Sequence, residues 1–402
     1  MPDHPTHPDI DLLDGDFYAG DPFPLYAWMR EHAPVYWDAK NELWAITRHA
    51  DVQEVAKTPE LFCNGQGMRP KVPSIPSMIN MDGKLHKQRR GLVNRGFTPR
   101  RIAEQEGRVR EVCRDLIARI APRGECDFVM DFAAHVPMIM IGDMLGVAPE
   151  DRDMLLRWSD DLLRGTHASA DPEAAMLAMN AFGEYAEYNE RVVADRRANP
   201  GGDDLMSLLV DGVVDGERLD DEALLQESLL ILIGGDETTR HVMTGGMYQL
   251  LRNPDQCAAL RADPAKIPTA VEEMLRWVTP IQNMARTVTR ETTYGGQTMR
   301  EGQKLVLLYP SANRDERVFD APEVFDTTRS PNEHLAFGGY GPHFCLGSAL
   351  ARLELRVFFE EVLPVLPDLE LVDDTPPRLR SSDFVVGIEH MPVRFTPFIP
   401  RP

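Results

Sequence analysis

The sequence predicts one large, mostly α-helical domain across residues 1–402, with small β-sheets. Three observations support this fold class. The pattern is helical over 98–120, 135–198, 219–251 and 346–359, strand-like patterns are short, and no linker, low-complexity run or internal repeat divides the sequence. A chain of 402 residues that is 43% hydrophobic can bury a large core within a single domain.

The charge and cysteine content exclude several classes of protein. Lys and Arg number 43 against 64 Asp and Glu, and the net charge of −21 argues against nucleic acid or an anionic membrane as a partner. The five cysteines are odd in number and widely spaced, so we expect neither a disulfide framework nor a zinc site. Residues 1–10 have no basic and no apolar region, so we expect a soluble, cytoplasmic protein without a membrane anchor. We also expect it to be a monomer.

The N-terminal third combines a hairpin, a long loop and a helix. Residues 34–48 hold two β-branched and aromatic runs around a polar turn, which predicts a hairpin. Residues 64–77 are rich in Pro, Gly and Ser and are expected to form a long loop, of the kind that often carries function. His86 and Arg90 then lie four apart on one helix face, where they either hold a carboxylate or form a solvated basic face.

Helices dominate the middle of the chain. Thr98 followed by proline predicts a helix start, and the pattern is helical again from about 135 to 198. A break across 165–172 would let this segment move as a lid. The longest helix is predicted at 219–251, and its apolar centre is far too short to cross a bilayer.

Two adjacent glycines, Gly234 and Gly235, interrupt this longest helical pattern. Each costs about 1 kcal/mol in a helix interior, so they predict a bulge or the close approach of a ligand. Glu237 and Thr238 place an acid and a hydroxyl at the same spot. The alternative is that these polar side chains merely cap a helix break.

A cysteine stands between a glycine-rich loop and a helix near the C-terminus. Three glycines and a proline in 338–342 predict a compact loop that can fold closely under a flat ligand. Leu346 and the apolar positions after it follow helical spacing, so Cys345 is expected at a helix N-terminus that favours a thiolate. A thiolate is an anionic metal ligand. The alternative is a small buried hydrophobic residue.

The spacing of this loop resembles the haem-thiolate loop of the cytochrome P450 monooxygenases, although it is one residue longer than the commonest form between Phe337 and the cysteine. The resemblance implies that Cys345 is the axial ligand of the haem iron, that Phe337 packs beside it, and that His343 meets a haem propionate. Gly347 completes the motif.

Further motifs of this family match in order along the chain. They imply that His86, Arg90 and Arg286 bind haem propionates, and that Glu237 and Thr238 handle protons during oxygen activation. Glu273, Arg276 and Arg329 match a structural trio that supports the haem pocket; by spacing alone, the first two form an ordinary ion pair on a helix. The apolar residues expected to contact substrate are Val72, Ile75, Met78, Ile79, Ile233, Gly234, Met284, Phe384 and Val385.

The resemblance implies a triangular α-helical prism with haem b between the long central helix and the cysteine loop. Longer runs at 124–129, 141–147, 157–162 and 232–241 resemble the bacterial steroid C26 monooxygenases, which act on cholesterol and cholest-4-en-3-one side chains. Electrons would come from a ferredoxin and its reductase. An acidic ferredoxin would meet a local basic patch drawn from Arg89, Arg95, Arg100, Arg101, Arg352 and Arg356.

Other functions stay open at this point. Macrolides, terpenes and fatty acids are alternative substrates. Peroxide-driven oxygenases and dehydratases of similar fold often lack an acid and alcohol pair, which Glu237 and Thr238 supply here. A haem sensor without enzymatic activity would need no proton route.

Overall fold

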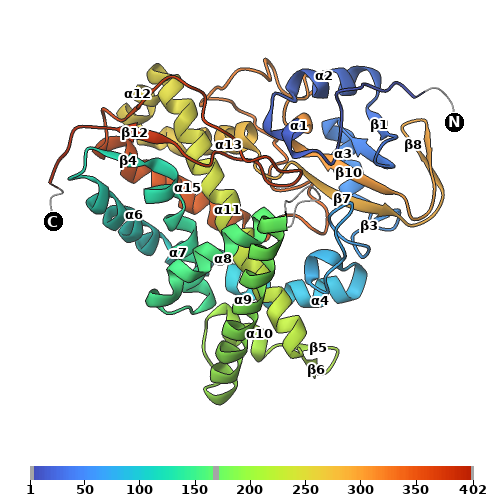
Figure 1. Cartoon of the computed structure of the whole chain (residues 1–402), viewed down its shortest axis with the longest axis horizontal. Coiled ribbons are helices and arrows are strands. Elements are labelled where there is room, and N and C mark those ends of the chain that lie inside the picture. Colours follow the sequence, from blue (N-terminus) through green and yellow to red (C-terminus); the bar gives the residue numbers. More distant parts are fainter. Residues whose placement is uncertain (1–3, 166–171, 400–402) are drawn as a thin grey trace.

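The computed structural model of the chain describes residues 4–165 and 172–399. The centre of the predicted lid break at 165–172 lies outside these described residues. Figure 1 shows a mainly helical body, with the largest sheet and the first helices on the right of the view. The helices are α1 (Gly15–Ala19), α2 (Phe23–His32), α3 (His49–Lys57), α4 (Gly83–Asn94), α5 (Pro99–Glu104), α6 (Glu106–Ile120), α7 (His135–Leu145), α8 (Arg152–Gly165), α9 (Pro172–Ala198), α10 (Leu205–Val210), α11 (Asp221–Arg252), α12 (Pro254–Ala262), α13 (Ile267–Val278), α14 (Tyr309–Ala312) and α15 (Ser348–Val365).

The largest sheet has the strand order β1-β2-β10-β7-β3. Its first two strands are antiparallel, with Val35 opposite Ile46, which confirms the predicted hairpin. In β7, Met284 and Arg286 face a cavity while Ala285 between them is buried on the other side, as the alternation of a strand requires. The strands are β1 (Val35–Asp38), β2 (Leu43–Ile46), β3 (Phe62–Cys63), β4 (Glu125–Asp127), β5 (Val213–Val214), β6 (Glu217–Arg218), β7 (Asn283–Val288), β8 (Thr292–Tyr294), β9 (Gln297–Met299), β10 (Lys304–Leu308), β11 (Glu370–Leu371) and β12 (Pro392–Arg394).

The central helix α11 forms where the longest apolar pattern predicts it and packs against α7, α13 and α15 (Figure 1). The Asp220 side chain accepts a hydrogen bond from the N–H of Ala223 and begins the helix. The helix continues through the two glycines, so of the two predicted explanations the bulge is wrong, and the close approach of a ligand stays a prediction. A Cβ on Gly235 would lie 2.8 Å from Cγ1 of Ile141 in α7, whereas Gly234 faces open space. Close helix packing therefore requires the second glycine.

One stretch of the described chain, Phe128–Leu145, is long and apolar enough to cross a membrane. However, 67% of it is buried inside the fold. Phe128, Phe132 and Met140 belong to the same core cluster as Phe358 of α15. In this structure the stretch serves as part of the core.

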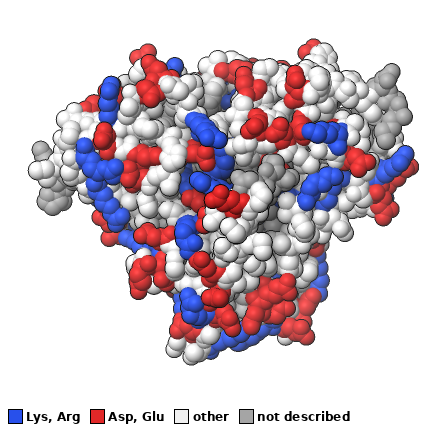
Figure 2. Space-filling view, viewed as in Figure 1, with Lys and Arg blue, Asp and Glu red and all other residues white. Residues whose placement is uncertain are grey.

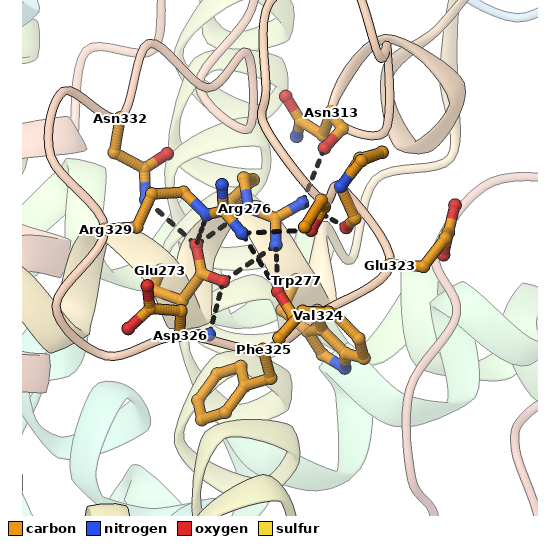
Figure 3. A network of polar contacts seen from close by, with 12 residues as sticks. Glu273, Arg276, Trp277, Asn313, Glu323, Val324, Phe325, Asp326, Arg329 and Asn332 are labelled. Atoms are coloured by element: carbon orange, nitrogen blue, oxygen red, sulfur yellow. Dashed lines mark hydrogen bonds and ion pairs between the residues drawn. The ribbon is translucent and has the colours of Figure 1, made fainter.

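Glu273 and Arg276 of α13 form a fully buried ion pair that the loop before the cysteine completes (Figure 3). Arg276 Nε and Nη2 donate to the two Glu273 oxygens at 2.7 Å each. Arg329 Nε donates to Glu273 Oε2 at 3.1 Å, and so does the side-chain amide of Asn332. The structure thus brings together the three residues assigned to a structural trio.

Candidate active site

A cavity of about 270 Å³ lies between α11 and the cysteine loop. Residues from α4, β7 and the segment near Phe384 also line it. Most residues singled out in the sequence converge here, which means that segments distant in the chain build one site. Those that line the cavity are Met78, Ile79, His86, Arg90, Ile233, Gly234, Glu237, Thr238, Met284, Arg286, Phe337, His343, Cys345, Gly347, Phe384 and Val385.

Val72 and Ile75 do not line the cavity, which corrects their assignment to the substrate pocket. Ile75 is 37% exposed. The loop is fixed on one side where Arg69 pairs with Asp383 at 2.8 Å, and on the other where the turn at Met78 is buried. The span between these two points therefore passes over the outside of the fold.

The cysteine loop is closed by a hydrogen bond from the N–H of Cys345 to the carbonyl of Phe337 at 2.9 Å. Of its glycines only Gly338 has a positive φ, +94°. A Cβ on Gly341 would lie 1.9 Å from the carbonyl oxygen of Ala56 in α3. A Cβ on Gly339 would lie 2.6 Å from Cβ of Ala56. Backbone freedom alone therefore does not explain these glycines, because contact with α3 also demands two of them.

The Cys345 side chain is exposed only in the sense that it opens into the cavity, since it lies deep inside the fold. Burial raises the pKa of its thiol, and the N–H groups of Gly347 and Ser348 together with Arg90 and Arg352 oppose this shift. The helix N-terminus alone therefore does not secure the predicted thiolate. A coordinated metal cation would, because it removes the thiol proton outright.

Two histidines and two arginines form one wall of the cavity. The rings of His86 and His343 stack with their centroids 4.1 Å apart. Burial, His343 and Arg90 lower the pKa of His86 to about 4. Within the described residues His343 Nε2 is buried without a hydrogen bond, and it lies 3.9 Å from Oδ1 of Asp82. Together with Arg286, this unpaired nitrogen fits the carboxylates of a haem.

Thr238 and Glu237 face different surroundings. The hydroxyl of Thr238 donates to the carbonyl of Gly234 at 3.1 Å, within the cavity wall. Glu237 Oε1 accepts from Arg240 at 2.5 Å and from Arg380. Burial opposes ionisation of Glu237, but the two arginines hold its pKa below the ordinary value. The acid is therefore an ionised group shared between the cavity and a buried cationic cluster.

Sequence reasoning missed two buried acids near this pair. Burial raises the pKa of Asp236 to about 7. Glu354 of α15 lines the cavity, and burial together with Asp236 raises its pKa well above the ordinary value. The available signal was an acid within an apolar helical stripe, between Leu353 and Leu355.

The expected patch of free arginines is largely neutralised. Arg89 is mostly buried and pairs with Glu227, which removes it from the surface. Arg100 forms an ion pair with Glu104, Arg352 with Glu272, and Arg356 with Glu106. Figure 2 likewise shows acidic and basic side chains interspersed over the visible face.

Comparisons with known proteins agree with this site. The family described as Cytochrome P450 matches residues 30–388. A Steroid C26-monooxygenase of Mycobacterium tuberculosis is 51% identical over 98% of both chains, and one of Mycolicibacterium smegmatis is 50% identical over 98% of both. The structure of a Mycobacterium marinum cytochrome P450 in complex with pseudoionone superposes with a TM-score of 0.90 at 34% identity, over 98% of this chain and 100% of that one.

Proposed function

The chain belongs to the cytochrome P450 family, and from this premise we propose that it is a monooxygenase that oxidises the terminal C26 methyl of a steroid side chain, such as that of cholesterol or cholest-4-en-3-one. The observation that carries the substrate class is the 51% identity to a Steroid C26-monooxygenase across 98% of both chains. The apolar cavity walls beside Cys345 support it.

Haem b is the cofactor of this proposal. Cys345 would bind its iron, and the carboxylates would meet His86, Arg90, Arg286 and His343, the last of which has an unpaired nitrogen there. Phe337 and Gly347 line the same cavity and would border the macrocycle. When bound, the haem would activate dioxygen with two electrons delivered by a redox partner, and the Cys345 thiolate would contribute electron density to the iron.

The protein handles protons through two side chains. The Thr238 hydroxyl lies in the cavity wall and donates to the Gly234 carbonyl, so its oxygen can accept a hydrogen bond from the cavity, and rotation of the hydroxyl would redirect its own proton there. Glu237 is held ionised by Arg240 and Arg380, so its carboxylate can accept a proton and release it toward the cavity. General acid–base transfer of this kind contributes about 10²- to 10⁴-fold to rates.

Positioning decides which C–H bond reacts. A terminal methyl is harder to attack than the secondary and tertiary carbons of a side chain, so the walls must hold it in a fixed place. Ile79, Ile233, Met284, Phe384 and Val385 supply apolar contacts around the cavity. Hydrophobic burial of the ligand would drive binding.

Redox partners and location complete the proposal. We expect a ferredoxin and a ferredoxin reductase to deliver electrons to a monomeric enzyme. A cytoplasmic location is consistent with its cysteines, since all five are free thiols. Arg95 and Arg101 form no ion pair in the described chain and are the arginines of the expected patch best able to meet an acidic partner.

The test is a titration of the ferric holoenzyme with cholest-4-en-3-one. We expect a saturable shift from low to high spin, followed by formation of the C26 alcohol with a ferredoxin system. A second candidate ligand is pseudoionone, which is favoured by the solved structure with a TM-score of 0.90. A spin shift with pseudoionone and none with the steroid would overturn the substrate and keep the monooxygenase.

A further inference from the structure

Glu227 is a buried carboxylate in α11, about two turns before Gly234. Its Oε1 accepts a hydrogen bond from the backbone N–H of Met78 at 2.8 Å. The same oxygen accepts from Nη1 of Arg89 in α4 at 3.3 Å. One side chain of the central helix therefore contacts both the long loop after β3 and the helix that follows this loop.

The loop forms a compact unit that ends in a 3₁₀ turn, Met78–Asn80. Asn80 Oδ1 accepts from the N–H of Met68 at 2.8 Å, and the side-chain amide of Asn64 donates to the carbonyl of Ile79 at 3.1 Å. The carbonyl of Met68 in turn accepts from the N–H of Ala285 in β7 at 2.7 Å. The loop is thus attached to the sheet at one end and to Glu227 at the other.

The end held by Glu227 forms a wall of the cavity. Met78 and Ile79 both line it. Met78 belongs to the same packed cluster as Ile231, which lies one turn after Glu227 and lines the cavity as well. The carboxylate therefore fixes the turn against the part of α11 that leads to Gly234, and a displacement of about 1 Å at such a wall can cost about 10²-fold in rate.

A role in stability alone does not account for this arrangement. A buried ion pair is often less stabilising than well-packed apolar residues of similar volume. Here the pair is also incomplete, because Glu227 Oε2 and Arg89 Nε are buried and form no hydrogen bond in the described chain. What the carboxylate does provide is a directional acceptor for one backbone N–H of the loop.

We propose that Glu227 is a positioning residue that sets regiospecificity: from α11 it holds the Met78–Asn80 turn in place as the wall that decides which carbon of the bound side chain is presented for oxidation. The proposal rests on the monooxygenase function above. Its structural premise is the chain's own hydrogen bond between Glu227 and Met78, and that premise can be tested without turnover.

The first arm measures backbone hydrogen exchange in the holoenzyme. Glu227→Ala removes the acceptor, whereas Glu227→Gln keeps a carbonyl oxygen that can accept from Met78. We expect exchange in residues 75–80 to be roughly ten- to a hundredfold faster in Glu227→Ala and near wild type in Glu227→Gln. Residues 43–46 of β2, which lie in the sheet away from this turn, should not change. Glu222→Gln, an exposed acid of the same helix, is the matched control. If Glu227→Ala does not fold, Glu227→Leu fills the volume without an acceptor.

The second arm measures ligand binding and products. We expect Glu227→Ala to raise the Kd for cholest-4-en-3-one about tenfold and to move product away from the terminal methyl, with an unchanged spectrum of the reduced carbonyl complex. Wild-type exchange in residues 75–80, or faster exchange with wild-type Kd and product ratios, would overturn the proposal. If the wild-type enzyme gives no spin shift with the steroid, the substrate assignment fails separately. The binding arm is then run with 4-phenylimidazole, and an unchanged Kd in Glu227→Ala overturns the role of Glu227.

Discussion

Glu273 and Glu237 are both fully buried carboxylates that bind arginines, and they differ in how completely their surroundings are satisfied. Both oxygens of Glu273 are used, by Arg276, Arg329, Asn332 and the N–H of Asp326 (Figure 3). Arg276 also donates hydrogen bonds to the backbone carbonyls of Asn313, Pro322 and Val324. Every charge in this network therefore has a fixed partner, and we call the network saturated in this sense; the neutral Oδ1 of Asn332 is buried without a hydrogen bond in the described chain.

The cluster around Glu237 is unsaturated. Arg240 Nε and Arg380 Nε are buried and form no hydrogen bond in the described chain. Both ring nitrogens of His241, which follows Arg240, also have no hydrogen-bond partner among the described residues, and burial lowers the pKa of His241 well below the ordinary value. Arg240, which binds Glu237, also donates from Nη2 to Oδ1 of Asp160 in α8 at 2.8 Å.

The difference separates two uses of buried charge. A saturated network has one arrangement and therefore fixes the fold, whereas an unsaturated one can exchange partners and admit water or protons. The network around Glu273 lies outside the cavity lining, whereas the cluster around Glu237 reaches the cavity through Glu237 itself. Stability should therefore depend mainly on Glu273, and turnover mainly on Glu237.

The largest effect is expected from Glu273→Ala. Removal of one partner leaves Arg276 buried and uncompensated, which costs about 3–5 kcal/mol. Denaturant unfolding of the holoenzyme and the yield of bound haem measure this loss. Glu104→Ala, which breaks the exposed pair with Arg100, should leave both unchanged. If the two variants were equally stable, the distinction drawn for the saturated network would fail.

Glu237→Gln should fold and still lose activity. We expect product formation to fall about a hundredfold, because the amide cannot carry a proton to the cavity. Product per oxygen consumed and the solvent deuterium isotope effect provide the measurement. Glu237→Asp, which keeps the carboxylate, should recover part of the rate. Wild-type turnover in Glu237→Gln would remove the proton-transfer role.

Thr238→Ala should lower the amount of product formed per oxygen consumed more than it lowers the rate of oxygen consumption. Loss of the hydroxyl should lower product per oxygen consumed roughly tenfold, while substrate binding stays within about twofold of wild type. Peroxide formed during turnover measures the uncoupling. Thr244→Ala is the matched control, because its hydroxyl also donates to the carbonyl four residues earlier in α11 and lies outside the cavity lining. Equal coupling in both variants would contradict the assignment of Thr238.

The smallest effect is a pH dependence of stability from Glu227. Burial raises its pKa from 4.5 to about 7, against the lowering by Arg89 and the Met78 N–H. Between these values the folded protein holds a proton that the unfolded chain has lost, so this group stabilises at low pH and its contribution disappears as the pH rises through about 7. Relative to Glu227→Gln, the wild-type Tm should fall by about 1–3 °C from pH 5 to pH 7.5. A constant difference would show that Glu227 is ionised throughout.

The sequence determined the elements and the identity of the chemical groups. Helical periodicity gave α11 to within two residues at its start, and residues 34–48 gave the hairpin. The spacing around Cys345 placed the cysteine at the cavity beside Phe337 and His343. These features are local, since the side chains and backbone of a few neighbouring residues fix them.

Only the tertiary structure decided how these groups are paired. Arg380 reaches Glu237 from 143 residues away, and Met78 reaches Glu227 across 149. The same long-range packing turned Ile75 outward, buried Arg89 and demanded Gly341 beside α3. Such contacts depend on how whole helices and loops pack together, and no local pattern of a single sequence specifies that packing. The sequence therefore predicted that Glu237 is a functional acid, whereas tertiary packing determined that it binds Arg240 and Arg380.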